Sequence, residues 1–185
     1  MLARLHELAG TDLTPTVVTF DRNPLAVLRP DRAPRPLTDL DGRLELLEGA
    51  GVEHVLVLTF DEALAALPAA AFIDDVLVRA LRARAVLVGA DFRFGAGGSG
   101  DVGLLQASAA DAGFTVELLP TVAPDGARVS SSVVRDLLAA GDVAGAAVLL
   151  GRAPTVRGLV VPGAQRGREI GFPTANLEPA AAGFI

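Results

Sequence analysis

The run from Arg166 to Leu177 carries the side chains best suited to metal and phosphate chemistry. Thr174 and Asn176 follow a Gly-Phe-Pro turn and offer a hydroxyl and an amide oxygen, the hard kind of ligand that Mg²⁺ accepts. Arg166 and Arg168 precede them and suit phosphate. Such a site needs a packed domain around it, and only eight residues follow Leu177. The run is therefore either ornamental or the opening of a domain that has been cut away.

A second candidate phosphate site is the serine run Ser130, Ser131 and Ser132, followed by Arg135. Serines at the start of a helix leave hydroxyls and free backbone N–H groups at the positive end of the helix dipole. With an arginine one turn further on, this arrangement suits a phosphate. The alternative interpretation is a plain serine N-cap with a solvated arginine.

Two loops follow predicted strands at the edge where open α/β sheets bind their ligands. The first contains Phe20, Asn23 and Pro24, and its alternative interpretation is a simple Asn-Pro turn.

The second loop contains Asp91, Phe92, Arg93 and Phe94. Two phenylalanines around an arginine suit the stacking of a planar ring, with Asp91 or backbone groups fixing the polar edge of that ring. The alternative is that both rings belong to the core.

Gly95, Gly97 and Gly100 also match the dinucleotide fingerprint GxGxxG, and Glu117 lies near the expected distance beyond it. Five residues separate these glycines from the preceding strand, whereas the fingerprint requires the strand to end at the first glycine. A mobile glycine loop is the interpretation that we favour.

The elements that must position these residues alternate between strands and helices. Apolar, β-branched runs predict strands, and periodic apolar residues predict helices between them. The strands are expected at 15–20, 54–60, 85–89 and 114–119, and the helices at about 38–50, 68–82 and 101–112. This alternation predicts an α/β fold with a doubly wound parallel sheet.

The ends of the chain have a different character. A helical pattern begins at the first residue without a capping side chain before it, as if an element were entered halfway. Two helices are expected at about 131–140 and 142–150, and a strand at 155–161. Proline and glycine then punctuate the sequence, so we place a domain boundary near residue 151.

Composition excludes several classes of function. A net charge of −6 argues against a nucleic-acid surface, and the absence of cysteine excludes thiolate nucleophiles and thiolate metal sites. All sixteen basic residues are arginine, so a P-loop lysine and a Schiff base are excluded too. No stretch is long and apolar enough to predict a membrane span, and no signal peptide is recognisable, so a cytoplasmic protein without membrane contact is expected.

Taken together, these segments resemble the bifunctional riboflavin kinase/FAD synthetase of bacteria over nearly the whole chain. The segment 20–24 resembles the family's Phe-Asp-Pro-His-Pro motif, and 89–95 resembles its Asp/Asn-Phe-x-Phe-Gly loop. The segment 128–135 is similar to its Val-Ser-Ser-Thr-x-x-Arg signature, and 173–176 to its Pro-Thr-Ala-Asn motif.

The resemblance implies two domains. Residues 1–150 would form a Rossmann-like nucleotidyltransferase that joins FMN and ATP into FAD and pyrophosphate. Residues 151–185 would open a riboflavin kinase, a small β-barrel. The small-molecule substrates would be ATP, FMN and riboflavin, with Mg²⁺ as cofactor, and no residue of this chain is predicted to act as a covalent catalyst.

The resemblance also implies roles for particular residues. ATP phosphates would lie on Ser130, Ser131, Ser132 and Arg135. The flavin would lie on the following residues: Phe20, Asn23, Pro24, Asp91, Phe92, Arg93 and Phe94. In the kinase part, Gly171, Pro173, Thr174 and Asn176 would bind ATP, and Thr174 and Asn176 would also bind Mg²⁺.

The departures from the family pattern are expected to matter. The family's first strand and its His-x-Gly-His turn should precede the helix that begins at Met1, Asn23 replaces a histidine, and Ser132 replaces a threonine. The chain also ends before most of the kinase barrel. We therefore expect a fragment, truncated at both ends, that performs neither reaction well. A non-catalytic flavin- or nucleotide-binding protein is the alternative.

Overall fold

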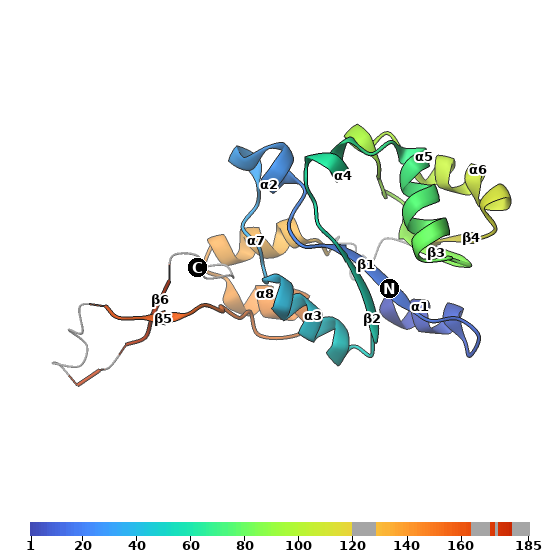
Figure 1. The fold of residues 1–185 in the computed structure, drawn as a ribbon. Helices are drawn as coiled ribbons and strands as arrows, with labels where there is room; N and C mark the ends of the chain where they lie inside the picture. The colour runs from blue at the N-terminus through green and yellow to red at the C-terminus, as the bar shows by residue number, and fades with distance from the viewer. Residues whose placement is uncertain (120–128, 164–170, 173, 179–185) are drawn as a thin grey trace. The chain divides into compact units, whose positions relative to one another are not determined.

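The computed structural model describes residues 1–119, 129–163, 171–172 and 174–178. The chain forms two compact units, one of Met1–Pro34 with Leu44–Arg128 and one of Arg35–Arg43 with Val129–Ile185. The elements of the first part of the chain are α1 (Leu2–Ala9), β1 (Thr16–Phe20), α2 (Leu25–Leu28), η1 (Pro30–Arg32), α3 (Leu40–Gly49), β2 (His54–Leu58), α4 (Glu62–Ala66), α5 (Ala69–Phe72), η2 (Ile73–Ala80), β3 (Ala85–Gly89), η3 (Ala96–Gly98), α6 (Val102–Ala112) and β4 (Thr115–Leu119) (Figure 1). The later elements are α7 (Ser131–Ala139), α8 (Val143–Leu150), β5 (Val160–Val161) and β6 (Asn176–Leu177).

The strands of the first unit form two parallel pairs. β1 pairs with β2, in a register that ends at Phe20 opposite Leu58, and β3 pairs with β4, ending at Gly89 opposite Leu119. The prediction of parallel strands that alternate with helices is confirmed. Among the described residues, the two pairs remain separate two-stranded sheets, so a single doubly wound sheet stays a prediction.

The main core of the first unit packs helices against the second strand pair. It is an apolar cluster to which α5, η2, α6 and β3 contribute, and Leu56 and Leu58 of β2 pack against it. Its buried members are Ala69, Phe72, Ile73, Val76, Leu77, Val88, Phe94, Leu105 and Phe114. Burial of such side chains is the main favourable term in folding, so these contacts hold the loops around them in place.

The predicted helix at 68–82 is confirmed, but it changes its winding on the way. Four residues of α-helix in α5 continue as the π-helical stretch η2. The wider winding lets Leu81 N donate to Val76 O, five residues earlier. The element ends at Ala80, and Arg82, two residues later, has a φ of 48°, the one positive value of a non-glycine residue in the described part of the chain.

Helix α1 is attached to the rest of the first unit by two polar contacts. The Arg4 guanidinium donates to both carboxylate oxygens of Glu117 on β4, at 2.5 and 3.0 Å. The His6 ring contacts the backbone carbonyl of Gly51, at 2.9 Å from Nε2. These contacts place the helix against chain segments that are far from it in sequence.

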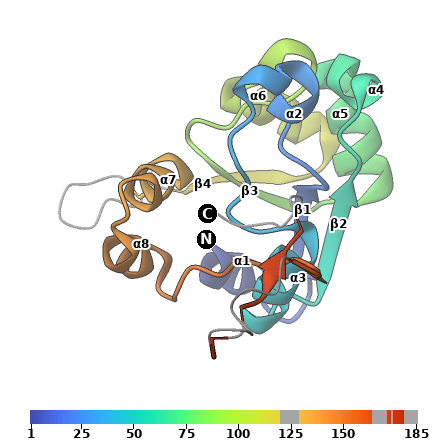
Figure 2. The same cartoon turned by 90° about the vertical axis from the view of Figure 1, so that its left-hand side faces the viewer.

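The second unit contains the helices α7 and α8, which lie side by side (Figure 2). Each begins at a capping side chain: Ser130 accepts from Val133 N, and Asp142 accepts from Gly145 N. Gly151 then ends α8 in the left-handed conformation, with φ 68°. Both helices were expected from the sequence.

The predicted strand at 155–161 is mostly wrong. Only Val160–Val161 is a strand in the structure, and it pairs antiparallel with Asn176–Leu177. Most residues of this segment are exposed, and its pairing with β6 is confined to Val160 and Val161. β-branched residues favour a strand only where neighbouring strands pack against them, which explains the difference. No helix among the described residues is long and apolar enough to cross a membrane.

Candidate functional site

The loop after β1 is held by local contacts. Phe20 packs its ring against the edge of Phe60, with ring centroids 5.0 Å apart. The Asn23 side-chain oxygen accepts from Leu25 N at 2.9 Å, and Pro24 begins the short turn of helix α2. Asn23 therefore shapes the turn, as in the simpler interpretation of its Asn-Pro sequence.

Asp21 lies inside this loop and was not among the predicted site residues. Its Oδ1 accepts from Phe60 N at 2.9 Å, and its Oδ2 accepts from Arg22 Nη2 at 2.8 Å. The hydrogen bond from Arg22, and then that from the Phe60 amide, holds the pKa of the Asp21 carboxyl below its usual value. Its position in a motif-like segment was the only available signal.

The loop after β3 brings three aromatic rings together. Phe92 stacks on Phe94 with centroids 5.4 Å apart, and Phe94 contacts Phe72 at 5.5 Å. Phe94 is 7% exposed and belongs to the core cluster, whereas Phe92 is only partly buried. The core interpretation thus describes Phe94 fully and Phe92 in part, because Phe92 also packs against the core cluster but keeps some exposed surface.

The polar residues of the same loop point away from the core. Asp91 is exposed, and the Arg93 guanidinium lies 3.4 Å from an Asp101 carboxylate oxygen. Asp101 also caps α6 by accepting from Leu104 N. Arg93 is thereby connected to the start of α6.

The glycine segment between these residues forms a closed loop. Phe94 and Gly100 exchange two backbone hydrogen bonds, at 3.1 and 2.8 Å, and η3 fills the space between them. A Cβ at Gly95 would lie 2.5 Å from the Ala69 backbone, so the loop packs directly on α5. This is a closed turn between a bridge and a capped helix. It differs from the strand–glycine–helix turn of a dinucleotide fingerprint.

The two predicted flavin loops share a neighbour. Helix α4 follows β2 and contacts both α2, which follows β1, and η3, which follows β3. Ala96 N also donates to Leu67 O, just beyond α4, at 2.8 Å. Three carboxyl-terminal strand ends therefore lead into one connected group of loops and short helices, as Figure 1 shows.

The predicted phosphate residues lie at the start of α7, in the second unit. Ser130 accepts from Val133 N at 3.4 Å, a long cap, and Ser131 and Ser132 are exposed in the first turn. Arg135 is partly buried, and its Nε donates to Arg35 O at 2.7 Å. That bond holds the guanidinium against the 35–43 segment of the same unit.

The predicted kinase residues are described in part. Gly171 adopts φ 81°, Thr174 and Asn176 are exposed, and Pro173 lies outside the described residues. Asn176 pairs with Val161 across β5 and β6, and its side chain lies where a Cβ on Gly163 would be. Two accessible oxygen ligands suit a Mg²⁺ ion that takes its other ligands from phosphate and water.

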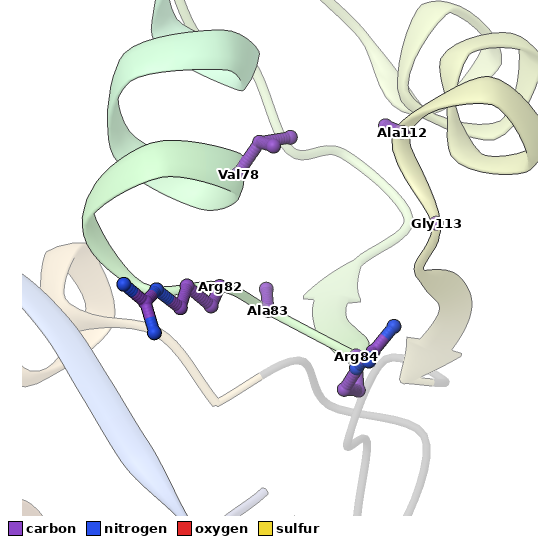
Figure 3. Close-up of a pocket in the computed structure, with 6 residues that line it drawn as sticks. All are labelled: Val78, Arg82, Ala83, Arg84, Ala112 and Gly113. Carbon is purple, nitrogen blue, oxygen red and sulfur yellow. The ribbon is translucent and has the colours of Figure 1, made fainter.

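A surface hollow of about 190 Å³ lies elsewhere in the first unit (Figure 3). It opens at the amino-terminal end of β3, between the last turns of η2 and α6, and Arg82 and Arg84 line it. Figure 3 shows the two guanidinium groups pointing apart. This hollow contains none of the predicted site residues.

Two protein-family models match this chain, and together they cover most of it. A family model described as FAD synthetase matches residues 1–133, and one described as riboflavin kinase matches residues 150–184. A bifunctional riboflavin kinase/FMN adenylyltransferase of Escherichia coli K12 is 45% identical over 87% of this chain and 51% of its own. One from Pseudomonas fluorescens is 42% identical over 96% of this chain and 57% of its own. The chain thus spans about half the length of these relatives.

A solved structure agrees with the fold. The crystal structure of a macrolide-efflux protein from Streptococcus pneumoniae matches with a TM-score of 0.79 at 31% identity. The match covers 96% of this chain and 58% of that one. The similarity therefore extends through both units of the present chain.

Proposed function

Since the chain belongs to the FAD synthetase family, we propose that it binds FMN and ATP and serves adenylyl transfer between them. The observation that carries this proposal is the match of the FAD synthetase model to residues 1–133. The partly exposed Phe92 ring, in the loop that leads to η3, supports a flavin site at this edge, where α4 contacts both α2 and η3. FMN would contact Phe20, Asn23, Pro24 and the loop of Asp91, Phe92, Arg93 and Phe94.

In the proposed reaction, a phosphate oxygen of FMN attacks the α-phosphorus of ATP. A new P–O bond forms, the bond between the α-phosphorus and the bridging oxygen breaks, and pyrophosphate leaves with that electron pair. Ser130, Ser131, Ser132 and Arg135 would hold the ATP phosphates at the start of α7. Their contribution is positioning and charge neutralisation, which stabilise a transition state without a covalent intermediate.

The second part of the proposal concerns residues 151–185, which we assign to the start of a riboflavin kinase barrel. The riboflavin kinase model at residues 150–184 supports this assignment, as does the strand pair β5–β6. Gly171, Pro173, Thr174 and Asn176 would contact ATP. A Mg²⁺ ion held by Thr174 and Asn176 would neutralise phosphate charge when bound.

The finer architecture belongs to the same proposal. We assign residues 1–150 to a doubly wound adenylyltransferase domain in which both strand pairs contribute to one sheet. The parallel direction within each pair and the shared core contacts of β2 and β3 support it.

Titration of the full chain against FMN, followed by flavin fluorescence, tests the proposal directly. A saturable rise in the fluorescence anisotropy of FMN is expected, because bound flavin rotates with the protein, whereas the chain has no Trp or Tyr that would quench it. Addition of ATP and Mg²⁺ with product separation then reports FAD. Absence of any flavin binding would contradict the proposal and also the alternative of a non-catalytic flavin-binding protein. Slow FAD formation would agree with the expectation that this chain performs the reaction poorly.

Two variants separate the flavin and phosphate parts of the site. Phe92→Ala is expected to weaken FMN binding by about tenfold, since stacking on one ring contributes on the order of 1–3 kcal/mol, and to leave ATP binding unchanged. Arg135→Ala is expected to do the reverse. Phe114→Leu, at a buried position of the same core cluster without a predicted ligand contact, is the control for loss of an aromatic core residue.

A further inference from the structure

We propose that Asp21 is a positioning residue of the flavin site, which fixes the loops after β1 and β2 through its contact with the Phe60 amide and Arg22. This proposal rests on the proposed function. It concerns a residue that makes no predicted contact with FMN itself. The role of the Asp21 carboxylate would be to hold in place the loops that contact FMN.

The first step is the pattern of hydrogen bonds where the strand pair ends. Phe20 opposite Leu58 is the last pair of the register, and Asp21 N still donates to Leu58 O at 3.0 Å. Beyond that point the next backbone donor, Phe60 N, is bound by the Asp21 carboxylate at 2.9 Å. A side chain therefore takes the place of the next backbone acceptor and continues the pairing past the end of the strands.

The second step is the charge around this bond. Arg22 donates to the same carboxylate from Nε at 3.0 Å and from Nη2 at 2.8 Å. The Asp21 side chain is only 18% exposed, so it is largely shielded from water while it makes these bonds. Hydrogen bonds to a carboxylate are stronger than those between neutral groups. Both arginine nitrogens donate to the same oxygen, Oδ2, and Oδ1 accepts from the Phe60 amide.

The third step is what the contact positions. Phe60 is 8% exposed, and its ring packs on Phe20, a predicted flavin residue. The next residue, Asp61, caps α4 by accepting from Leu64 N at 2.8 Å. Asp21 thus joins the predicted flavin loop of Asn23 to the start of α4, the element that contacts both predicted flavin loops.

The test measures FMN affinity, ATP affinity and the exchange of the Phe60 amide in the full chain. Asp21→Ala is expected to speed exchange of the Phe60 amide and to weaken FMN binding by about tenfold, because small misplacements of binding groups are costly. ATP binding, assigned to α7, is expected to stay unchanged. Asp21→Asn keeps an oxygen acceptor for the Phe60 amide but removes the negative charge that binds Arg22. Its FMN affinity is therefore expected to lie between those of Asp21→Ala and the wild-type chain.

Asp31→Ala is the matched control, because this carboxylate also precedes an arginine in sequence but is 78% exposed. Equal FMN affinity of Asp21→Ala and the wild-type chain would overturn the positioning role while leaving the proposed function intact. Parallel loss of ATP and FMN binding would also overturn it, since that marks a general loss of structure. A wild-type chain that binds no FMN would overturn both.

Discussion

At the scale of single residues, the glycine loop is shaped by what lies next to each glycine. Gly95 and Gly97 both have positive φ, 73° and 62°, which side chains rarely adopt. They differ in their surroundings, because a Cβ at Gly95 would meet the Ala69 backbone at 2.5 Å, whereas nothing lies within 4 Å of one at Gly97. Gly95 is therefore required both for its backbone angle and for its close packing on Ala69, whereas Gly97 is required only for its backbone angle.

Gly95→Ala is expected to lower the free energy of unfolding by about 2–4 kcal/mol, through backbone strain together with crowding against α5. The matched change Gly97→Ala is expected to cost only the strain, about 1 kcal/mol. Chemical denaturation of both variants checks this. Equal losses in the two variants would show that packing on Ala69 does not matter.

Residue types alone predicted which loops carry polar and aromatic groups, but not what each side chain contacts. The sequence shows Asp21 beside Arg22, yet its bond to Phe60 spans 39 positions and depends on the register of β1 and β2. In the same way, Phe92 and Phe94 look equivalent in sequence. In the structure Phe94 contacts Phe72 and is buried in the core cluster, whereas Phe92 packs at the edge of that cluster and is only partly buried.

At the scale of elements, α1 depends on an unusual histidine contact. Both ring nitrogens of His6 lie 2.9 Å from backbone carbonyl oxygens, Nδ1 from Leu2 and Nε2 from Gly51. A neutral imidazole has one N–H donor and can satisfy only one carbonyl, whereas the imidazolium donates to both. The contact with Gly51, then that with Leu2, and the nearby Glu53 charge raise the pKa of His6 above its ordinary value.

The attachment of α1 is therefore expected to weaken as the pH rises. A raised pKa in the folded state adds stability below the ordinary value of about 6.5, and this is lost as the pH rises through the folded value. His6→Gln is expected to lower the melting temperature more at about pH 5.5 than at about pH 8.5. Thermal melts of both chains at the two pH values check this.

His54→Gln is the control, since His54 is exposed on β2. A difference between wild type and His6→Gln that does not change with pH would contradict a charged His6.

Most elements could be predicted from the sequence because their apolar patterns are local. The strand at 85–89 matches β3 residue for residue, and the helix at 101–112 differs from α6 by one residue. What the sequence does not contain is the pairing. Which strands pair, and how much of the predicted strand at 155–161 forms, both depend on partner strands far along the chain.

At the scale of the whole molecule, the second unit leaves large apolar side chains in water. Val148 on α8 is 80% exposed, and Leu159 and Val160 are 69% and 68% exposed. Ala146 is the buried residue of α8, although nearly every residue of this helix is apolar. Exposed apolar surface of this kind favours association.

The chain is therefore expected to self-associate as its concentration rises, and Val148→Lys is expected to reduce this. Leu28→Lys is the control, because Leu28 is 56% exposed on α2 in the other unit and gains the same charge. Light scattering over a concentration series checks this. Equal effects of both changes would assign the association to net charge and not to α8.

The way the chain passes between its two units also sets an order of events during synthesis. Residues 35–43 belong to the second unit, but their partners begin at residue 129. The hydrogen bond from Arg135 to the Arg35 carbonyl cannot form until residue 135 has been synthesised, one hundred positions later in the sequence. At ribosomal speeds of about 5–20 residues per second, that is a delay of about 5–20 s. Residues 35–43 are thus synthesised early and stay without their α7 contact until that helix emerges from the ribosome.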